Sequence, residues 1–304
     1  MQSERLRGLI AAAYTPLTED GHVNTAAVAP LVEHLLSSGI TGLYVCGSTG
    51  EGMSLSSDER KEVAEAFTKT TAGRVPVIVQ VGHNSLVEAR SLAEHAQHIG
   101  ADMVSATCPS YFKVNGVQGL IASMAQVAAG APNLPFYYYH IPALTGSTID
   151  VVQFLRQAPN AIPTLAGLKY TDTKLFEFQE CLELSDGQYD VVWGCDEMLL
   201  GAIATGAHAA IGSTYNVAAP LYQRIISAFE AGNTQESRRL QSLSIQMIRT
   251  MNQYPFHSAM KAVLELRGLA VGGCRLPQQS MSGEEKALLK SQLETIGFFD
   301  WSET

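Results

Sequence analysis

Eight short apolar segments recur along the chain at a spacing of roughly 25–35 residues, the length of one β-strand and one α-helix joined together. The segments are rich in β-branched, aromatic and small side chains, which is typical of parallel strands covered on both faces. The predicted strands are GLIAAAY (8–14), LYVCG (43–47), VPVIVQV (75–81), MVSATC (103–108), PFYYYHI (135–141), LAGLKY (165–170), DVVWGC (190–195) and AAIGS (209–213).

Amphipathic segments between these strands predict helices. Residues 56–70 begin with serines and acidic residues, a favourable helix N-terminus, and residues 26–39 and 85–100 each end at a glycine that can terminate a helix. Eight strand–helix units predict an α/β fold, the (β/α)8 TIM barrel. The main alternative is an open doubly wound sheet, which usually carries a GxGxxG turn after its first strand. The first predicted strand is not followed by that motif.

Only helical patterns follow the eighth strand, at residues 216–232, 234–253 and 283–297. The first of these helices can close the barrel, and the others form a C-terminal helical appendage. We therefore expect residues 1–232 to form the barrel with the active site, and residues 233–304 to form C-terminal helices packed on it. Since no low-complexity linker separates the two parts, the packing should be tight.

The charge and the apolar pattern exclude several classes of protein. A net charge of −9 disfavours binding to nucleic acid, which requires a basic face. The longest weakly polar run, residues 198–212, is too short and too broken to span a membrane. No signal-peptide pattern opens the chain, and the five cysteines include no CxxC pair. These features predict a cytoplasmic protein with reduced thiols.

Polar side chains gather where the predicted strands end. In a TIM barrel the carboxyl ends of the strands carry the active site, so this distribution predicts a site that binds a small molecule. The polar groups are GSTGE (47–51), PSYFK (109–113), HIP (140–142), Lys169 with Thr171, GCDE (194–197) and GSTYN (212–216).

Lys169 lies in the sixth predicted strand, where a lysine is unusual. With a period of two, it shares a face with Leu165 and Gly167. If that face lines the barrel, loss of water favours the neutral amine, which is a nucleophile towards carbonyl carbons. The alternative is a structural ion pair, with Asp172 as the partner.

Three other groups each allow two interpretations. Tyr139 shares a face with Tyr137 and Ile141; its phenol could transfer protons beside a reactive amine, or its ring could simply fill the core. Ser48 and Thr49, with nearby backbone N–H groups, could hold a carboxylate or phosphate, or could cap the turn.

Asp196 and Glu197 are adjacent carboxylates that could accept hydrogen bonds from a polyol or ligate a divalent metal. A metal site needs further ligands on neighbouring strand ends. Those ends supply tyrosine, lysine and serine instead, and His83 has no ligand-like neighbour. The sequence therefore predicts no metal cofactor at these two residues.

Taken in order, GSTGE, YHIPALTG (139–146), GLKYTD (167–172), GCDE and GSTYN resemble the N-acetylneuraminate lyase branch of the dihydrodipicolinate synthase superfamily. The resemblance covers essentially the whole chain. Synthases of the superfamily carry an arginine just after the tyrosine–proline turn, for a second carboxylate. PALTG (142–146) has none, which favours a sugar as the aldehyde partner.

The resemblance implies a role for each matching residue. Lys169 would form a Schiff base with the substrate's keto carbon, and Tyr139 would transfer protons. Ser48 and Thr49 would bind the carboxylate. Tyr111 would correspond to a tyrosine that reaches the site of a neighbouring subunit. The sugar portion would be held by Thr171, Gly194, Asp196, Glu197 and Ser213.

The implied activity is that of a class I aldolase. It would cleave N-acetylneuraminate (a sialic acid) reversibly to pyruvate and N-acetylmannosamine, in a homotetramer, with no cofactor beyond the Schiff base through Lys169. One alternative is another pyruvate-dependent lyase or synthase of the superfamily that acts on a different sugar acid. Another is a non-catalytic sugar-acid sensor, which the presence of both Lys169 and Tyr139 disfavours.

Overall fold

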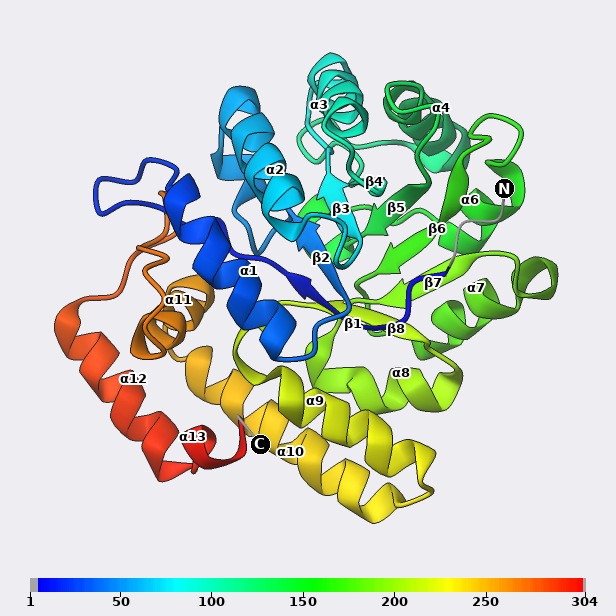
Figure 1. Ribbon diagram of the computed structural model, residues 1–304. Helices are drawn as coiled ribbons and strands as arrows, with labels where there is room; N and C mark the ends of the chain where they lie inside the picture. Colours follow the sequence, from blue (N-terminus) through cyan, green and yellow to red (C-terminus); the bar gives the residue numbers. More distant parts are fainter. Residues whose placement is uncertain (1–4, 303–304) are drawn as a thin grey trace.

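The computed structural model describes residues 5–302 and contains a closed barrel of eight parallel strands arranged in chain order, with β1 paired to β8 (Figure 1). The predicted (β/α)8 architecture is therefore confirmed. The strands are β1 (Gly8–Ala12), β2 (Gly42–Val45), β3 (Val77–Gln80), β4 (Met103–Ala106), β5 (Phe136–His140), β6 (Leu165–Tyr170), β7 (Asp190–Trp193) and β8 (Ala209–Gly212).

Helices surround the barrel and cover its outer face (Figure 1). Several begin where the sequence predicts, because a serine caps them: Ser56 and Glu59 form a reciprocal capping box at α2, and Ser85 caps α3. The helices of the barrel are α1 (Val28–Ser37), α2 (Ser57–Thr71), α3 (Leu86–His98), α4 (Gly116–Ala128), α5 (Pro142–Thr145), α6 (Val151–Gln157), α7 (Leu175–Gly187), α8 (Leu199–Thr205) and α9 (Tyr215–Glu230). Short 3-10 helices are η1 (Thr25–Ala27), η2 (Gly52–Ser54) and η3 (Asp196–Met198).

Several predicted strands extend past the carboxyl ends of the observed ones. Residues 43–47, for example, are predicted as a strand, but β2 ends at Val45. The reason is that Cys46 has a φ of 58°, so the chain turns there into the loop that follows. The polar groups at the strand ends accordingly lie in loops, where side chains can face a ligand.

Two apolar clusters form the core. The larger one fills the space between the strands and the surrounding helices. The smaller one lies inside the barrel and includes Ile10, Tyr44, Tyr137, Tyr139 and Ile211. The interior is therefore packed with side chains, as in other barrels of this size. The predicted common face of Tyr137, Tyr139 and Ile141 is confirmed, since all three pack in the smaller cluster.

The predicted face of Leu165 is wrong. Leu165 packs against the outer cluster, whereas Ala166 packs against the inner one. The pairing of β5 with β6 shifts between Phe136 and Tyr137, so that these residues pair with Leu165 and Gly167 and leave Ala166 out. This irregularity breaks the period of two at the start of β6. Lys169 lies beyond it and keeps its predicted inward direction.

The C-terminal helices gather on one side of the barrel beside α9 (Figure 1). They are α10 (Thr234–Met251), α11 (Phe256–Leu266), α12 (Gly283–Thr295) and α13 (Phe298–Trp301). Helix α11 is not among the helices that the sequence patterns predict; seven consecutive residues of it, 258–264, are buried. The division of the chain at residue 232 stays a prediction. None of the helices within residues 5–302 has the length and apolar character needed to cross a bilayer.

Candidate active site

Lys169 lies inside the barrel, with 4% of its surface exposed. Its Nζ lies 4.0 Å from the ring centroid of Tyr44 and 4.1 Å from that of Tyr139. Burial lowers the pKa of the amine to about 7, although the negative charge of Asp196 acts in the opposite direction. Close to half of the amine is therefore neutral at neutral pH, and the neutral form is a nucleophile.

Asp172, the predicted alternative partner, forms its ion pair elsewhere. Its carboxylate lies 3.0 Å from the ammonium of Lys174 and accepts a hydrogen bond from the backbone of Thr173. The structure therefore favours the reactive-amine interpretation of Lys169 over the Asp172 ion pair.

Tyr139 lies directly opposite Lys169 in the pairing of β5 with β6. Burial raises the pKa of its phenol to about 12, and the hydroxyls of Ser48 and Thr171 limit that rise. The phenol is therefore protonated at neutral pH and can donate a hydrogen bond. To accept a proton from a substrate, it must pass its own proton on.

The loop after β2 brings Ser48 and Thr49 to the same end of the barrel. Thr49 Oγ1 and Ser213 Oγ are 2.6 Å apart, so the loops after β2 and β8 meet. Thr49 is buried and Ser48 is half-buried. Ser213 therefore holds the Thr49 hydroxyl, and the Ser48 hydroxyl lies close enough to act on the phenol of Tyr139.

Asp196 and Glu197 occupy different environments. Asp196 is buried, and its Oδ2 accepts hydrogen bonds from the backbone N–H and the hydroxyl of Thr214, at 2.9 and 2.6 Å. Its Oδ1 is buried and has no hydrogen-bond partner among residues 5–302. Burial raises its pKa to about 6. Glu197 is exposed, so the two carboxylates do not act as a pair.

Two glycines make room for these polar groups. A Cβ on Gly194 would lie 2.0 Å from Thr171 Oγ1, and a Cβ on Gly212 would lie 1.9 Å from Asp196 Oδ1. Thr171 Oγ1 is also buried without a partner among the residues that the structure describes. Since buried polar atoms are normally hydrogen-bonded, both oxygens are suited to a polar ligand.

Tyr111 does not join the other site residues within its own chain. It lies in the loop after β4, is 78% exposed, and contacts only its neighbour Phe112 among the aromatic rings of residues 5–302. Its predicted reach into another subunit stays a prediction.

Tyr44 is a further residue of the site that the sequence motifs do not single out. Its ring contacts both Lys169 and Tyr139, and its hydroxyl donates to Ser105 Oγ at 3.2 Å. The position of Tyr44, a tyrosine in the middle of a short strand and on its inward face, is the sequence feature that could indicate a role in the site. Its contacts show that it shapes the space around the amine.

The appendage supports the site through hydrogen bonds that the sequence could not show. The Thr214 hydroxyl, which bonds to Asp196, also contacts the Tyr222 hydroxyl at 2.6 Å. Tyr222 in turn contacts Ser244 of α10 at 2.9 Å. Gln241 of α10 donates to the backbone oxygen of Asp196 at 3.3 Å. The position of Asp196 therefore depends on α10.

The glutamate of GSTGE points away from the site. The carboxylate of Glu51 lies 2.7 Å from the ammonium of Lys261 on α11, and the two side chains are 0% and 1% exposed. Glu51 also accepts a hydrogen bond from the backbone N–H of Arg275, at 2.8 Å. A buried charge requires such partners. This group, which we call the Glu51 clamp (Glu51, Lys261 and Arg275), joins the loop of Ser48 and Thr49 to the C-terminal region.

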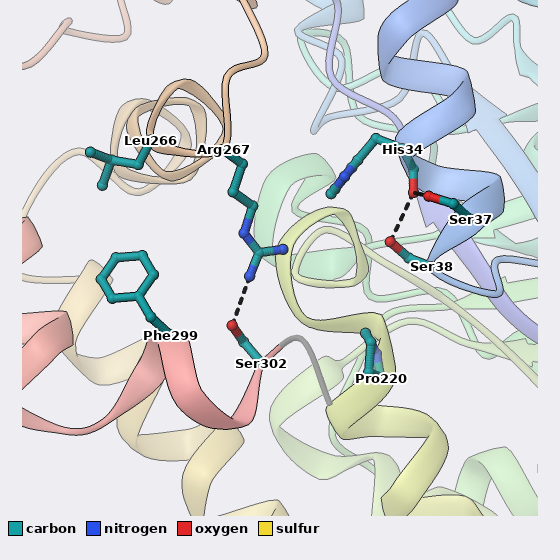
Figure 2. A pocket seen from close by; sticks show the side chains of 8 residues that line it. All are labelled: His34, Ser37, Ser38, Pro220, Leu266, Arg267, Phe299 and Ser302. Atoms are coloured by element: carbon teal, nitrogen blue, oxygen red, sulfur yellow. Dashed lines mark hydrogen bonds between the residues drawn. The ribbon is translucent and has the colours of Figure 1, made fainter.

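A separate cavity of about 400 Å³ lies between α1, α9, α11 and α13 (Figure 2). Arg267 and Ser302 meet across one side of it at 2.7 Å, and Ser37 and Ser38 at the end of α1 form another side. The end of α1 leads into the amino end of β2, opposite the strand ends that carry Lys169 and Tyr139. None of the predicted site residues lines this cavity.

Fold and site together define a (β/α)8-barrel enzyme with a buried, partly neutral lysine at the carboxyl ends of the strands. The model of the dihydrodipicolinate synthetase family matches residues 5–296. The chain belongs to this family.

Relatives with known names agree with that assignment. The chain is 41% identical over 281 residues to N-acetylneuraminate lyase A of Xenopus laevis, which covers 91% of this chain and 92% of the relative. It is similar to the structure of Proteus mirabilis N-acetylneuraminate lyase, with a TM-score of 0.95, 37% identity and coverage of 97% and 100%. It is also similar to the structure of the N-acetylneuraminate lyase (sialic acid aldolase) of Aliivibrio salmonicida. The TM-score is 0.95, the identity is 38%, and the match covers 97% of this chain and 98% of the relative.

Proposed function

We propose that the protein is a class I aldolase that cleaves N-acetylneuraminate reversibly to pyruvate and N-acetylmannosamine, a carbon–carbon lyase. The observation that carries the proposal is the amine of Lys169, held between two aromatic rings with a pKa lowered to about 7. The relatives at 37–41% identity carry the same activity in their names.

In the first step, the neutral amine of Lys169 attacks the C2 ketone of the open-chain sugar acid. The carbinolamine takes up one proton from solvent and loses water, which gives an iminium ion. Ser48 and Thr49 hold the adjacent carboxylate, since their hydroxyls and backbone N–H groups lie at the same end of the barrel. The burial that lowers the amine's pKa also excludes water from the reacting carbon.

In the second step, the C3–C4 bond breaks and its electron pair moves towards the iminium nitrogen to form an enamine. The proton of the C4 hydroxyl moves to the oxygen of Tyr139. Because that phenol is protonated beforehand, its own proton passes to the substrate carboxylate. The aldehyde, N-acetylmannosamine, leaves. Protonation of the enamine at C3 and hydrolysis then release pyruvate and restore the amine.

The sugar portion is assigned to the polar groups around this centre. Thr171 Oγ1 and Asp196 Oδ1 both lack partners among the described residues, which suits them to sugar hydroxyls. Glu197 follows Asp196 on η3 and Ser213 follows β8, so both belong to the same end of the barrel, and Gly194 leaves the space for Thr171. No step needs a metal ion or a nucleotide.

The proposal includes a homotetramer in the cytoplasm. The exposed pair of Tyr111 and Phe112 supports a contact between subunits, because large apolar side chains are seldom left in water together. Tyr111 would then complete the site of a neighbouring subunit.

Trapping of pyruvate should depend on pH with a midpoint near 7. The Schiff base forms from the neutral amine, so the initial rate should rise about tenfold per pH unit below 7 and level off above about pH 8. Incubation with pyruvate and cyanoborohydride over a pH series, with the adduct measured by mass spectrometry, tests this. An ordinary lysine would give a rate that still increases above pH 9.

Asp196→Asn provides the matched variant for that series. The carboxylate of Asp196 raises the pKa of Lys169, so its removal should lower that pKa further and shift the midpoint to lower pH. A midpoint that moves upwards would contradict the electrostatic account of the site.

Glu197→Ala should separate the two halves of the substrate. If Glu197 holds the sugar tail, pyruvate trapping stays unchanged. Cleavage of N-acetylneuraminate should then lose the value of a hydrogen bond to a charged acceptor, about 1.5–3 kcal/mol or roughly 10–150-fold in kcat/KM. In the condensation direction, a short aldehyde without the tail hydroxyls should lose far less.

Met198→Ala is the control, because Met198 is the exposed neighbour of Glu197 on η3. It should leave both reactions unchanged. Equal losses for long and short aldehydes in Glu197→Ala would oppose a sugar-tail role. A preference for another sugar acid over N-acetylneuraminate in the wild-type protein would favour a different pyruvate-dependent lyase.

A further inference from the structure

A second group of polar side chains lies on the outer face of the barrel, behind the active site. His140 ends β5 and points away from the barrel interior, where its ring packs near those of Tyr138 and Tyr170. Asp172 follows β6, and Glu177 lies in the first turn of α7. One ring nitrogen of His140 and one oxygen from each carboxylate all lie within 4.8 Å of one another.

His140 is the part of this group that lacks an explanation within the fold. It is 2% exposed, and neither ring nitrogen has a hydrogen-bond partner in the part of the chain that the structure describes. Buried polar atoms are almost always hydrogen-bonded, so these nitrogens are available to a ligand, and a metal ion would occupy one of them. In its neutral form an imidazole carries one nitrogen with a free lone pair, which is the atom that binds a metal ion.

The two carboxylates are held ready by their neighbours. The Tyr170 hydroxyl donates to Glu177 Oε1 at 2.7 Å, the kind of contact that orients a ligating carboxylate. The ammonium of Lys174 lies 3.0 Å from Asp172, but its side chain is half exposed and can turn into solvent. The ammonium of Lys174 thus partly balances the charge of the Asp172 carboxylate, and a divalent metal ion would balance it more completely.

We propose that His140, Asp172 and Glu177 bind a divalent transition metal ion, with Zn²⁺ the best match. Imidazole nitrogens and carboxylate oxygens are both zinc ligands, and three protein ligands leave the fourth position of a tetrahedral ion open to water. Mg²⁺ and Ca²⁺ prefer oxygen ligands alone, so the histidine disfavours them. Zinc bonds of roughly 2.0–2.2 Å require the three side chains to close around the ion.

The metal ion in this site would have a structural role. Lys169 and Thr171 belong to the same stretch of chain but are directed to the active site, whereas His140 faces the other side of the barrel wall. Zinc would join the ends of β5 and β6 to α7 and stabilise the folded protein in proportion to its occupancy. It would not take part in carbon–carbon cleavage.

The test uses the full-length protein, stripped with EDTA and dialysed against Zn²⁺. After dialysis we expect the zinc content of the wild type to exceed that of Glu177→Gln and of His140→Gln by one ion per chain. Its Tm should rise by roughly 4 °C at a hundredfold excess of Zn²⁺ over Kd. Glu177→Gln can still accept the Tyr170 hydrogen bond, so it should remain folded. Glu183→Gln, an exposed carboxylate further along α7, is the matched control and should keep the zinc.

Co²⁺ gives an independent readout, because a tetrahedral site produces a visible absorption band that Glu177→Gln should lose. Equal metal content in the wild type and Glu177→Gln, or no uptake by the wild type, would overturn the proposal. The cleavage rate at 25 °C should be the same before and after EDTA. A rate abolished by EDTA and restored by Zn²⁺ would overturn the structural role.

Discussion

Lys169→Ala abolishes both the trapped pyruvate adduct and the cleavage of N-acetylneuraminate in the expected result. The variant removes the group that forms the covalent bond to the substrate in the proposed mechanism. Loss of the nucleophile in covalent catalysis lowers kcat by a factor on the order of 10⁶. Cleavage should fall to the background of the assay. Mass spectrometry after reduction with cyanoborohydride measures the adduct, and a coupled assay for pyruvate measures turnover.

Two further variants make this result interpretable. Lys169→Met keeps most of the side-chain volume between Tyr44 and Tyr139, so its fold should be intact and its activity equally absent. Lys174→Ala, five residues away and half exposed, should trap pyruvate normally. An adduct at wild-type stoichiometry in Lys169→Ala would place the reactive amine elsewhere and remove the basis of the proposed function.

Tyr139→Phe should separate Schiff-base formation from bond cleavage. The substitution keeps the ring beside Lys169 and removes the phenol that the mechanism uses as a proton carrier. General acid–base catalysis contributes roughly 10²–10⁴-fold, so cleavage should fall by that amount while pyruvate trapping continues. Parallel measurements of kcat for cleavage and of the rate of adduct formation test this expectation.

Tyr138→Phe is the matched control, because Tyr138 is the next residue on β5 and packs in the outer cluster. It should leave both rates near those of the wild type. Near-normal cleavage by Tyr139→Phe would mean that the substrate carboxylate or another residue carries the proton without the phenol.

The fold could be predicted because its pattern repeats. Eight strand–helix units each carry the same signal, so an error in one unit leaves the barrel recognisable. The wrong prediction for Leu165 shows the limit of such patterns. The shift in pairing at Ala166 depends on how β6 pairs with β5, and the period of two within β6 alone does not contain that information. The helix α11 differs from a surface helix because residues 258–264 are all buried, and the partners that bury them are distant in sequence.

The candidate site could be predicted as a set of positions, but its electrostatics could not. Asp196 and Glu197 are adjacent in sequence, yet one is buried against Thr214 and the other is exposed. The contact of Tyr44 with Lys169 comes from two strands that lie far apart in the chain. Period-two reasoning gives the direction of a side chain, while its distance to another strand's side chain requires the closed barrel.

The Glu51 clamp has a consequence for how the protein is made. Its contacts join positions 210 and 224 residues apart, so the loop of Ser48 and Thr49 is among the first segments to leave the ribosome and among the last to be held in place. Apart from the clamp, the residues of the proposed catalytic and substrate-binding set all lie before Thr214. A chain that ends after β8 would thus carry each of those residues and would leave the carboxylate of Glu51 without Lys261 and Arg275. The contacts that hold Glu51, and with it the loop of Ser48 and Thr49, can therefore form only after α11 and the segment that follows it have been synthesised.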